Sequence, residues 1–331
     1  MTLLKKIFLF LLPLLLLIAC YIITDPFQNI LPHDVYLFTY RMLSRGNEST
    51  KVYLKNKDRY KYDSFIFGSS RSTAHTASEW AKYLPKGSAS FSFGAWNDPI
   101  EGIYKRVRLI DSLGSSIKNA FIIIDVDRTF KLQGDLKSSE LVADHYLISG
   151  ISKYDYYIND FLYYIKTPSL IITSLDYTLF HKRRNYMEGF IGMKPGDLDP
   201  VNNDWQPNSE KIILVDSAAY YKNSLDKFYQ RPAVESIAGV QINKAKEDCL
   251  YNIQAIFKKH NTNYKIVIGP LYDQVKFNPK DLAVLEQVFG KSNVYDYSGI
   301  NEITNNKFNY GADVVHYRKK VGNLIYRQIY R

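Results

Sequence analysis

The feature that most constrains the fold of this 331-residue chain is an alternation of short apolar runs with longer amphipathic stretches, which begins at Asp63. Short runs of β-branched and aromatic residues are typical of strands, and the periodic stretches between them are typical of helices. The predicted strands are 64–67, 89–93, 121–124, 264–268 and 293–295. The predicted helices are 77–84, 99–113, 242–259, 279–289 and 319–331. Strands joined by helices predict a parallel sheet.

Residues at the expected helix starts support this assignment. Thr76 and Glu79 have the spacing of a capping box. Asp98 is expected to cap the helix 99–113, whose first residue is Pro99. Asn278 is expected to cap the helix 279–289. Each of these helices therefore has a start signal of its own.

We expect an α/β fold, a doubly wound three-layer α/β/α sandwich around a five-stranded, mostly parallel sheet of order 2-1-3-4-5. The third run, 121–124, is apolar at every position, as in a strand covered on both faces. The alternation stops after Arg128 for about a hundred residues, which predicts a helical and loop insertion at about 130–235. Within it, 138–177 is expected to be helical and 187–207 to be a long loop.

The N-terminus is a membrane-directed segment. Lys5 and Lys6 precede an uncharged apolar run, 7–23, that would span about 26 Å as a helix, just short of a hydrocarbon core of roughly 30 Å. The lysines predict a cytoplasmic N-terminus. We expect a signal anchor or lipoprotein signal at 1–24, a juxtamembrane stalk at 25–62, and a domain at 63–331 on the extracytoplasmic side, in the periplasm or at the cell surface.

Two alternatives to an uncleaved anchor stay open. Leu17-Ile18-Ala19-Cys20 resembles the lipobox of bacterial lipoproteins, in which the cysteine is lipidated and becomes the mature N-terminus, although here the apolar run continues to Ile23. The other alternative is a buried helix of a soluble protein, but no polar residue breaks the run to give it a hydrated face.

The charge of the chain indicates which partners it could bind. Its net charge of +10 favours anionic partners. For an extracytoplasmic domain, such a partner would be a cell-envelope glycan or anionic polymer and not a nucleic acid.

The sequence has no pattern typical of disulfides, metals or cofactors. Cys20 and Cys249 are the only cysteines, which excludes a disulfide framework. The histidines lack metal-ligand spacing, and no phosphate-binding glycine loop or dinucleotide fingerprint occurs, so we expect neither a metal nor a cofactor.

Three segments carry candidate chemistry at the carboxyl edge of the predicted sheet. They are Gly68-Ser69-Ser70-Arg71, the turn 94–97, and Asp313-Val314-Val315-His316. A serine in a glycine turn before a helix lies where backbone N–H groups converge, as an oxyanion site requires. An aspartate three residues before a histidine can orient the imidazole toward that serine.

This order, a serine after the first strand and Asp-x-x-His before the last helix, resembles the SGNH, or GDSL-like, hydrolase superfamily. The resemblance covers roughly 63–128 and 262–331. It implies Ser70 as the nucleophile, His316 as the base and Asp313 as its orienting carboxylate. The matching oxyanion donors are Ser70 and Gly94, with Ser69 standing where the family has aspartate.

One position departs from the superfamily. Its Gly-x-Asn-Asp motif follows the third strand, where this chain has Asp125-Val126-Asp127-Arg128 without asparagine. Gly94-Ala95-Trp96-Asn97-Asp98 looks like that motif but comes one strand early and is one residue longer. Asn97 is therefore a candidate third oxyanion donor, and its alternative role is loop or cap chemistry beside Asp98.

The Gly-Ser-Ser variant with an N-terminal anchor looks most like membrane-anchored proteins of cell-envelope modification, such as the D-alanine transfer protein of teichoic-acid modification and the alginate O-acetylation proteins. The resemblance implies an acyl, most simply O-acetyl, transferase that acts on an envelope glycan or polymer through a serine ester, beside a multi-pass membrane acyl-transferase. A carbohydrate esterase or deacetylase is the first alternative. A non-catalytic scaffold or glycan-binding subunit of an export complex is the second.

Overall fold

The computed structural model describes residues 2–31, 44–131, 144–191 and 196–330. Its contacts divide the chain into two compact units. The first, here called the anchor unit, consists of residues 1–44 and 137–195, and the second, the sheet unit, of residues 45–136 and 196–331.

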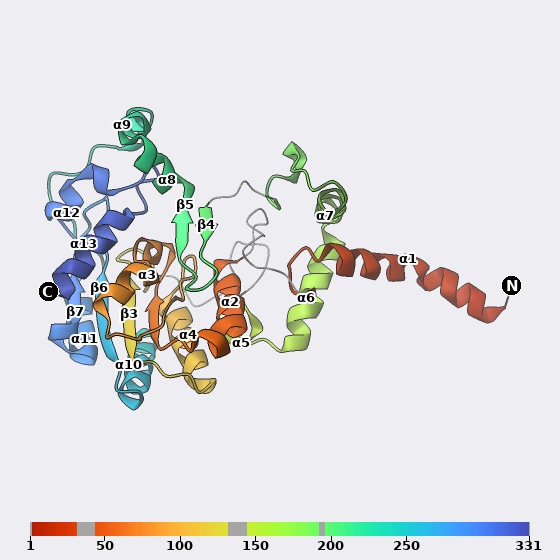
Figure 1. Cartoon of the computed structure of the whole chain (residues 1–331), viewed down its shortest axis with the longest axis horizontal. Coiled ribbons are helices and arrows are strands. Elements are labelled where there is room, and N and C mark those ends of the chain that lie inside the picture. The colour runs from red at the N-terminus through yellow and green to blue at the C-terminus, as the bar shows by residue number, and fades with distance from the viewer. Residues whose placement is uncertain (1, 32–43, 132–143, 192–195, 331) are drawn as a thin grey trace. The chain divides into compact units, whose positions relative to one another are not determined.

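The sheet unit is built on five parallel strands, which Figure 1 shows among the helices of this unit. They are β1 (Ser64–Phe67), β2 (Ser90–Ser92), β3 (Asn119–Ile124), β6 (Asn263–Ile268) and β7 (Val294–Asp296). Their order is β2-β1-β3-β6-β7, with Phe65 paired to Phe91 on one side and to Ala120 on the other. The predicted α/β class and the order 2-1-3-4-5 are therefore confirmed, counting only the strands of this sheet.

The remaining elements of the sheet unit connect or cover these strands. Its α-helices are α2 (Arg45–Tyr60), α3 (Ala77–Trp80), α4 (Ile100–Ser112), α8 (Asn208–Val215), α9 (Ser217–Lys222), α10 (Lys244–Lys259), α11 (Pro279–Phe289), α12 (Glu302–Asn305) and α13 (Lys319–Ile329). Its 3₁₀ turns are η1 (Ser70–Ala74), η2 (Ala81–Tyr83), η4 (Leu225–Lys227), η5 (Lys291–Asn293) and η6 (Lys307–Asn309).

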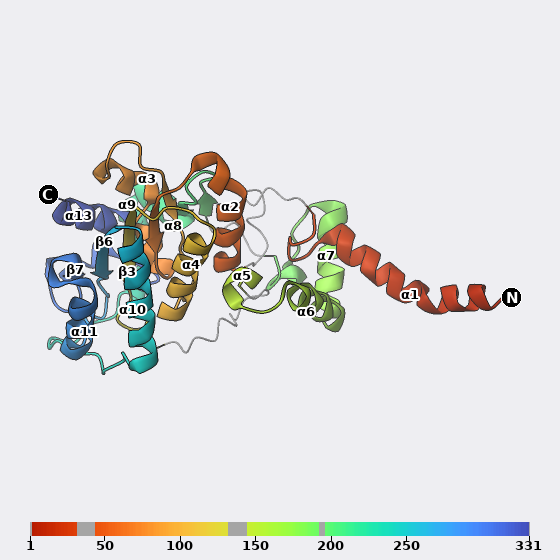
Figure 2. The same ribbon diagram turned by 90° about the horizontal axis from the view of Figure 1, so that it is seen from below.

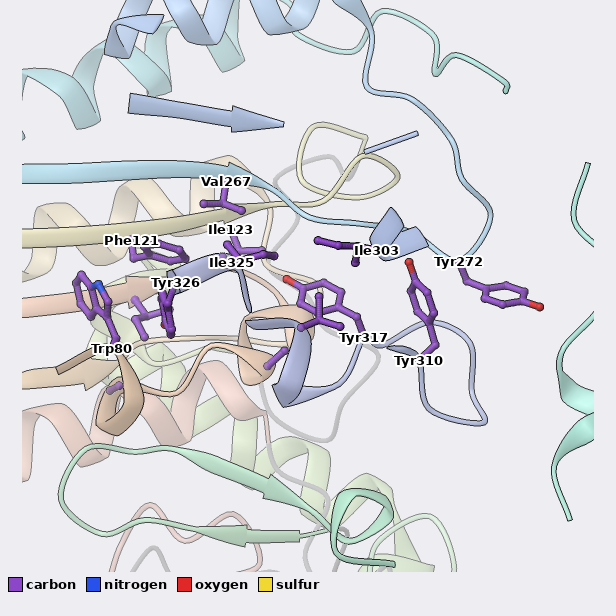
Figure 3. Packing of buried hydrophobic residues seen from close by; sticks show 14 residues of the cluster. Trp80, Phe121, Ile123, Val267, Tyr272, Ile303, Tyr310, Tyr317, Ile325 and Tyr326 are labelled. Atoms are coloured by element: carbon purple, nitrogen blue, oxygen red, sulfur yellow. The ribbon is translucent and has the colours of Figure 1, made fainter. Parts of the chain in front are cut away.

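Alternate residues of the strands bury apolar side chains on opposite faces of the sheet. Phe65 of β1 meets Tyr53 of α2, with ring centroids 5.9 Å apart. On the other face Phe121 of β3 packs against Trp80 of α3 and Tyr326 of α13, at 5.9 and 5.0 Å. Figure 3 shows this second cluster, in which Tyr326 lies beside Phe121 and Trp80, and Tyr310 lies toward Tyr272.

Two of the three expected residues cap their helices, although Thr76 forms only one half of the predicted capping box, and the predicted helix 77–84 is α3 followed by the 3₁₀ turn η2. Thr76 accepts a hydrogen bond from the Glu79 N–H, and Asn278 caps α11 by accepting from the Lys280 N–H. The expectation for Asp98 is wrong, because α4 begins at Ile100 with Pro99 as its cap. The Asp98 carboxylate instead accepts from Arg106 Nε at 3.0 Å, and both side chains are almost fully buried.

The predicted long loop at 187–207 contains a hairpin, which corrects that expectation. Strands β4 (Gly196–Leu198) and β5 (Trp205–Pro207) pair antiparallel, with Asp197 opposite Gln206. Each strand has only three residues, too few for a period of two to appear in the sequence.

Helix α2 occupies part of the segment in which we expected a juxtamembrane stalk, of which residues 32–43 lie outside the described residues. Residues 45–62 group with the sheet unit. Tyr53 is fully buried among Phe65, Phe91 and Phe93. Helix α2 is thus part of the packing of the sheet unit.

The anchor unit is helical. It contains α1 (Leu3–Thr24), α5 (Tyr146–Ser149), α6 (Lys153–Lys166), α7 (Pro168–Phe180) and the turn η3 (Asn185–Met187). Figure 2 shows α1 leading away from α6 and α7. Helix α1 is long and apolar enough to cross a membrane, and a signal sequence has the same length and composition. The predicted N-terminal apolar helix is confirmed, while its sidedness stays a prediction.

Candidate active site

The segment after β1 places Ser70 at the carboxyl edge of the sheet. Gly68 has φ of +147°, and a Cβ there would lie 2.9 Å from Ile123 Cβ and 3.2 Å from Ser72 Cβ. Glycine is required at this position because β3 approaches so closely. Ser69 then caps η1, whose first residue is the partly buried Ser70.

A tight turn before α13 presents Asp313 and His316. The Gly311 N–H donates to the His316 carbonyl at 3.0 Å, and Val314 has φ of +50°. Asp313 Oδ1 accepts from the Val315 and His316 N–H groups, both at 3.0 Å. The carboxylate therefore stabilises the turn that carries its own histidine.

Ser70, His316 and Asp313 are hydrogen bonded in series. Asp313 Oδ2 lies 2.8 Å from His316 Nδ1, and His316 Nε2 lies 2.8 Å from Ser70 Oγ. An ionised carboxylate only accepts, so Nδ1 carries the proton and Nε2 is left to accept from the serine hydroxyl. The structure thus brings together the three residues named from the sequence, and their catalytic roles stay predictions.

The charge of Asp313 favours this arrangement. Burial opposes ionisation of its carboxyl, but the hydrogen bond and the charge of His316 hold the pKa below its usual value. A carboxylate that stays ionised can stabilise the imidazolium that forms when His316 takes a proton.

Arg71 links the serine segment to the histidine turn. Its Nε donates to the Val315 carbonyl at 2.9 Å, and its two terminal nitrogens donate to the two carboxylate oxygens of Asp127. Nη1 also lies 3.4 Å from the buried Asp125 carboxylate. Although burial opposes the charge, Asp125 and Asp127 raise the pKa of Arg71 above its usual value. In the sequence, Arg71 stands out only as the last residue of the segment 68–71.

The two aspartates after β3 differ in environment. Asp125 is fully buried, and burial raises the pKa of its carboxyl, although Arg71 and a hydrogen bond from Ser69 oppose the rise. Asp127 is more exposed; burial opposes its ionisation too, but the Arg71 hydrogen bond lowers its pKa. Ser69 therefore has a fixed partner below the surface.

Gly94 lies beside the serine segment. The Ala95 N–H donates to the Gly68 carbonyl at 3.1 Å, and Ser49 Oγ of α2 donates to the Gly94 carbonyl at 2.7 Å. Within the residues that the structure describes, neither the Ser70 N–H nor the Gly94 N–H has a hydrogen-bond partner. Both N–H groups thus meet the first requirement of an oxyanion donor, which is to have no acceptor within the protein.

Asn97, the third candidate donor, is exposed and has φ of +53°. Its side-chain oxygen accepts a hydrogen bond from Arg128. This contact orients the amide group and leaves its NH₂ as a donor.

The predicted insertion supplies support that sequence reasoning missed. Glu210 of α8 pairs with Arg318, next to the histidine turn, at 3.0 and 3.1 Å. Tyr220 of α9 accepts from the Ala312 N–H at 2.9 Å. No local pattern around these two residues could have identified their partners, which lie about a hundred positions away.

His75, the histidine nearest to Ser70 in the sequence, is fully buried. Its Nε2 lies 2.9 Å from the Tyr317 hydroxyl. Burial lowers the pKa of His75 from its ordinary 6.5 to about 3, so this residue is neutral. Among the described parts of the chain, no group of three histidine, cysteine or acidic residues could hold a metal ion.

Comparisons with known proteins do not assign the chain to a family. No protein-family model matches the chain, and a search of curated proteins also found no match.

Proposed function

We propose that the chain is a membrane-tethered, extracytoplasmic enzyme similar to SGNH hydrolases, which transfers an acyl group, most simply acetyl, to a cell-envelope glycan or polymer. The observation that carries this proposal is the series of 2.8 Å contacts from Asp313 through His316 to Ser70. Helices on both faces of a parallel sheet of order 2-1-3-4-5 support the doubly wound three-layer form of such an enzyme.

The first half of the reaction acylates the serine. Ser70 Oγ attacks the carbonyl carbon of an acyl ester or thioester while His316 Nε2 takes the hydroxyl proton. The carbonyl oxygen becomes an oxyanion that the Ser70 and Gly94 N–H groups can stabilise, with the Asn97 amide as a third donor. The tetrahedral intermediate then collapses, and His316 returns the proton to the departing alcohol or thiol.

The second half regenerates the serine. An acceptor hydroxyl of the glycan or polymer gives its proton to His316 Nε2 and attacks the acyl-serine carbonyl. The new ester forms as the bond to Ser70 Oγ breaks, and His316 protonates the serine. A water molecule in place of the acceptor would give the esterase alternative.

A membrane tether favours transfer over hydrolysis, because it holds the serine near a donor delivered at the membrane. The source of the acyl group in this proposal is a multi-pass membrane acyl-transferase. The basic surface implied by a net charge of +10 is suited to an anionic acceptor.

The test is to trap the acyl-enzyme. Full-length protein in detergent is incubated with p-nitrophenyl acetate, and the acetylated residue is located by peptide mass spectrometry. We expect an acetyl group on Ser70, loss of the adduct in Ser70→Ala, and much slower labelling in His316→Ala. Ser69→Ala is the matched control and should still be labelled.

Two results would contradict the assignment. Acetylation of Ser69 would move the nucleophile to the neighbouring residue. No serine adduct under conditions where the protein is folded would leave the scaffold or glycan-binding alternative. Adding a soluble glycan acceptor distinguishes the acyltransferase from the esterase. A transferase yields an acetylated glycan, whereas an esterase yields free acetate alone.

The tether has a separate test. A reporter active only outside the cytoplasm, fused after Arg331, should be active in cells, and a cytoplasmic reporter at the same place should be silent. Cys20→Ser then distinguishes the two anchors, since only a lipoprotein would lose lipid labelling. An active cytoplasmic reporter would overturn the proposed location.

A further inference from the structure

Helices α6 and α7 carry several large apolar side chains that are exposed in the described part of the anchor unit. On α6, Tyr154, Ile158 and Leu162 follow one another at intervals of four residues, so they lie along one side of the helix. Tyr154 is 81% exposed and Ile158 53%. On α7, Leu179 and Phe180 are 70% and 62% exposed. Soluble proteins seldom leave so many large apolar side chains uncovered on two adjacent helices.

The opposite side of α6 is the inner side of the anchor unit. Tyr156 and Tyr164 are buried there, together with Leu170 of α7. Helix α6 is therefore apolar on two sides, of which the anchor unit itself uses one. A helix with a second apolar side needs a second apolar environment.

The end of α1 packs directly against α6. The ring of Tyr21 lies 5.2 Å from the rings of both Phe161 and Tyr164, and Tyr21 is almost fully buried. Most of the apolar residues of α1 before Tyr21 are exposed. The residues of α1 that the protein buries fully, Tyr21 and Thr24, therefore lie in the last turn of the helix.

The length of α1 sets the depth at which this packing occurs. If Lys6 lies at the inner boundary of the hydrocarbon core, Tyr21 is 15 residues further along, or roughly 22 Å. The hydrocarbon core is roughly 30 Å thick. Tyr21 then lies at or inside the outer boundary, and the helices that surround it must reach the membrane surface.

Polar contacts fix this junction. The Asp25 carboxylate accepts from the backbone N–H groups of Asn29, Ile30 and Leu31 at 2.8 to 3.0 Å. The Asn29 side chain donates to Asp160 of α6 at 2.6 Å. The segment after α1 is thus a compact turn tied to α6.

We infer that α6 and α7 lie in the outer membrane–water interface, with Tyr154, Ile158, Leu162, Leu179 and Phe180 in contact with lipid. Residues 144–191 contain five basic and five acidic side chains, so this attachment is apolar and does not depend on anionic lipid. Tyrosine suits such a site because its ring is apolar and its hydroxyl is hydrated. The inference rests on the proposed tether and is independent of the serine chemistry.

The test uses lipid-dependent quenching of fluorescence. Full-length protein is reconstituted into neutral phosphatidylcholine vesicles whose acyl chains carry bromine near the headgroup end. Phe180→Trp and Tyr154→Trp each add one tryptophan to the three in the sheet unit, and the parent protein supplies the background. Phe308→Trp is the matched control, since Phe308 is an exposed aromatic residue of the sheet unit.

We expect bromine to quench most of the emission added by Phe180→Trp and Tyr154→Trp and to leave the emission added by Phe308→Trp largely unchanged, at low and at high salt. Added emission that bromine leaves unquenched in both anchor-unit variants would overturn the inference. In that case, a blue-shifted emission maximum would indicate a second copy of the chain on these helices, and a red-shifted one would indicate water. Acetylation of Ser70, measured on the same samples, reports the proposed chemistry separately.

Discussion

Acid should destabilise the sheet unit through His75. Its imidazole is fully buried against the rings of Phe121, Tyr317 and Tyr326, at centroid distances of 5.3 to 5.6 Å. The Tyr317 hydroxyl is its hydrogen-bond partner, and the other ring nitrogen has none within the described residues. A protonated imidazole would lose its hydration there without gaining a counterion.

The size of the effect follows from the pKa. Burial lowers the pKa of His75 from 6.5 to about 3, so the unfolded chain takes up a proton at a higher pH than the folded one. Between those values the unfolded state binds more protons, and stability falls as the pH falls. From about pH 7 to about pH 5, this residue removes about 2 kcal/mol of the free energy of unfolding.

Urea unfolding at the two pH values measures this loss. The full chain is studied in detergent, and its tryptophan fluorescence reports the sheet unit, because Trp80, Trp96 and Trp205 all belong to it. His75→Gln lacks a titrating group, so its stability should fall by about 2 kcal/mol less than that of the wild type over this interval.

The control is His260→Gln, which removes a partly exposed histidine bonded to Asp111. This variant should keep the wild-type loss of stability on acidification. If His75→Gln loses as much stability as the wild type between the two pH values, the burial of His75 is not the cause, and the reasoning is refuted.

Three further predictions concern the candidate site. Arg71→Met leaves Asp125 buried without a counterion and should lower the free energy of unfolding by about 3 kcal/mol in the same urea assay. A loss below about 1 kcal/mol would show that Arg71 does not stabilise the buried Asp125 carboxylate. Gly94→Ala would put a Cβ 2.5 Å from Ser72 Oγ, so it should cost about 1 kcal/mol alone and nearly nothing in a Ser72→Ala background, and additive losses would contradict that clash. Asp313→Asn keeps an acceptor for the turn but presents an amide N–H to the imidazole, which favours the wrong tautomer. Serine acetylation should slow on the order of 10⁴-fold with little change in stability, and an unchanged rate would remove Asp313 from the mechanism.

Local signals predicted much of the sheet unit. Helix α11 begins at Pro279 and ends before Gly290, as predicted, because cap, first residue and terminating glycine are neighbours in the sequence. Asp98 was assigned wrongly because its partner is Arg106, and whether a carboxylate caps a helix or forms a buried ion pair depends on tertiary packing. Residues 45–62 were assigned to a stalk because the aromatic rings that bury Tyr53 come later in the chain, from β1 and from the segment that contains β2.

The candidate site likewise contains residues that the sequence could identify and one whose partners it could not. Ser70, Asp313 and His316 could be named because each belongs to a short motif and the order of the motifs along the chain is informative. The short distances between these three residues are consistent with the parallel sheet, because the end of β1 and the segment between β7 and α13 lie at its carboxyl edge. Arg71 could not be assigned, because its carboxylate partners are more than fifty residues away. The available signal was a pair of aspartates directly after a buried apolar strand, which requires a nearby cation.

Under the proposed function, Arg71 also bears on the two aspartates that follow β3, where the SGNH superfamily has an asparagine. Two carboxylates at the end of this strand would repel an oxyanion, but Arg71 contacts both of them and also holds the Val315 carbonyl. The same side chain thereby offsets charge beside the serine and fixes the turn that presents His316. In the proposed enzyme, the segment after β3, 125–128, would position the base His316 through Arg71. In the SGNH superfamily, the same segment carries an oxyanion donor. Here the N–H groups of Ser70 and Gly94 would stabilise the oxyanion.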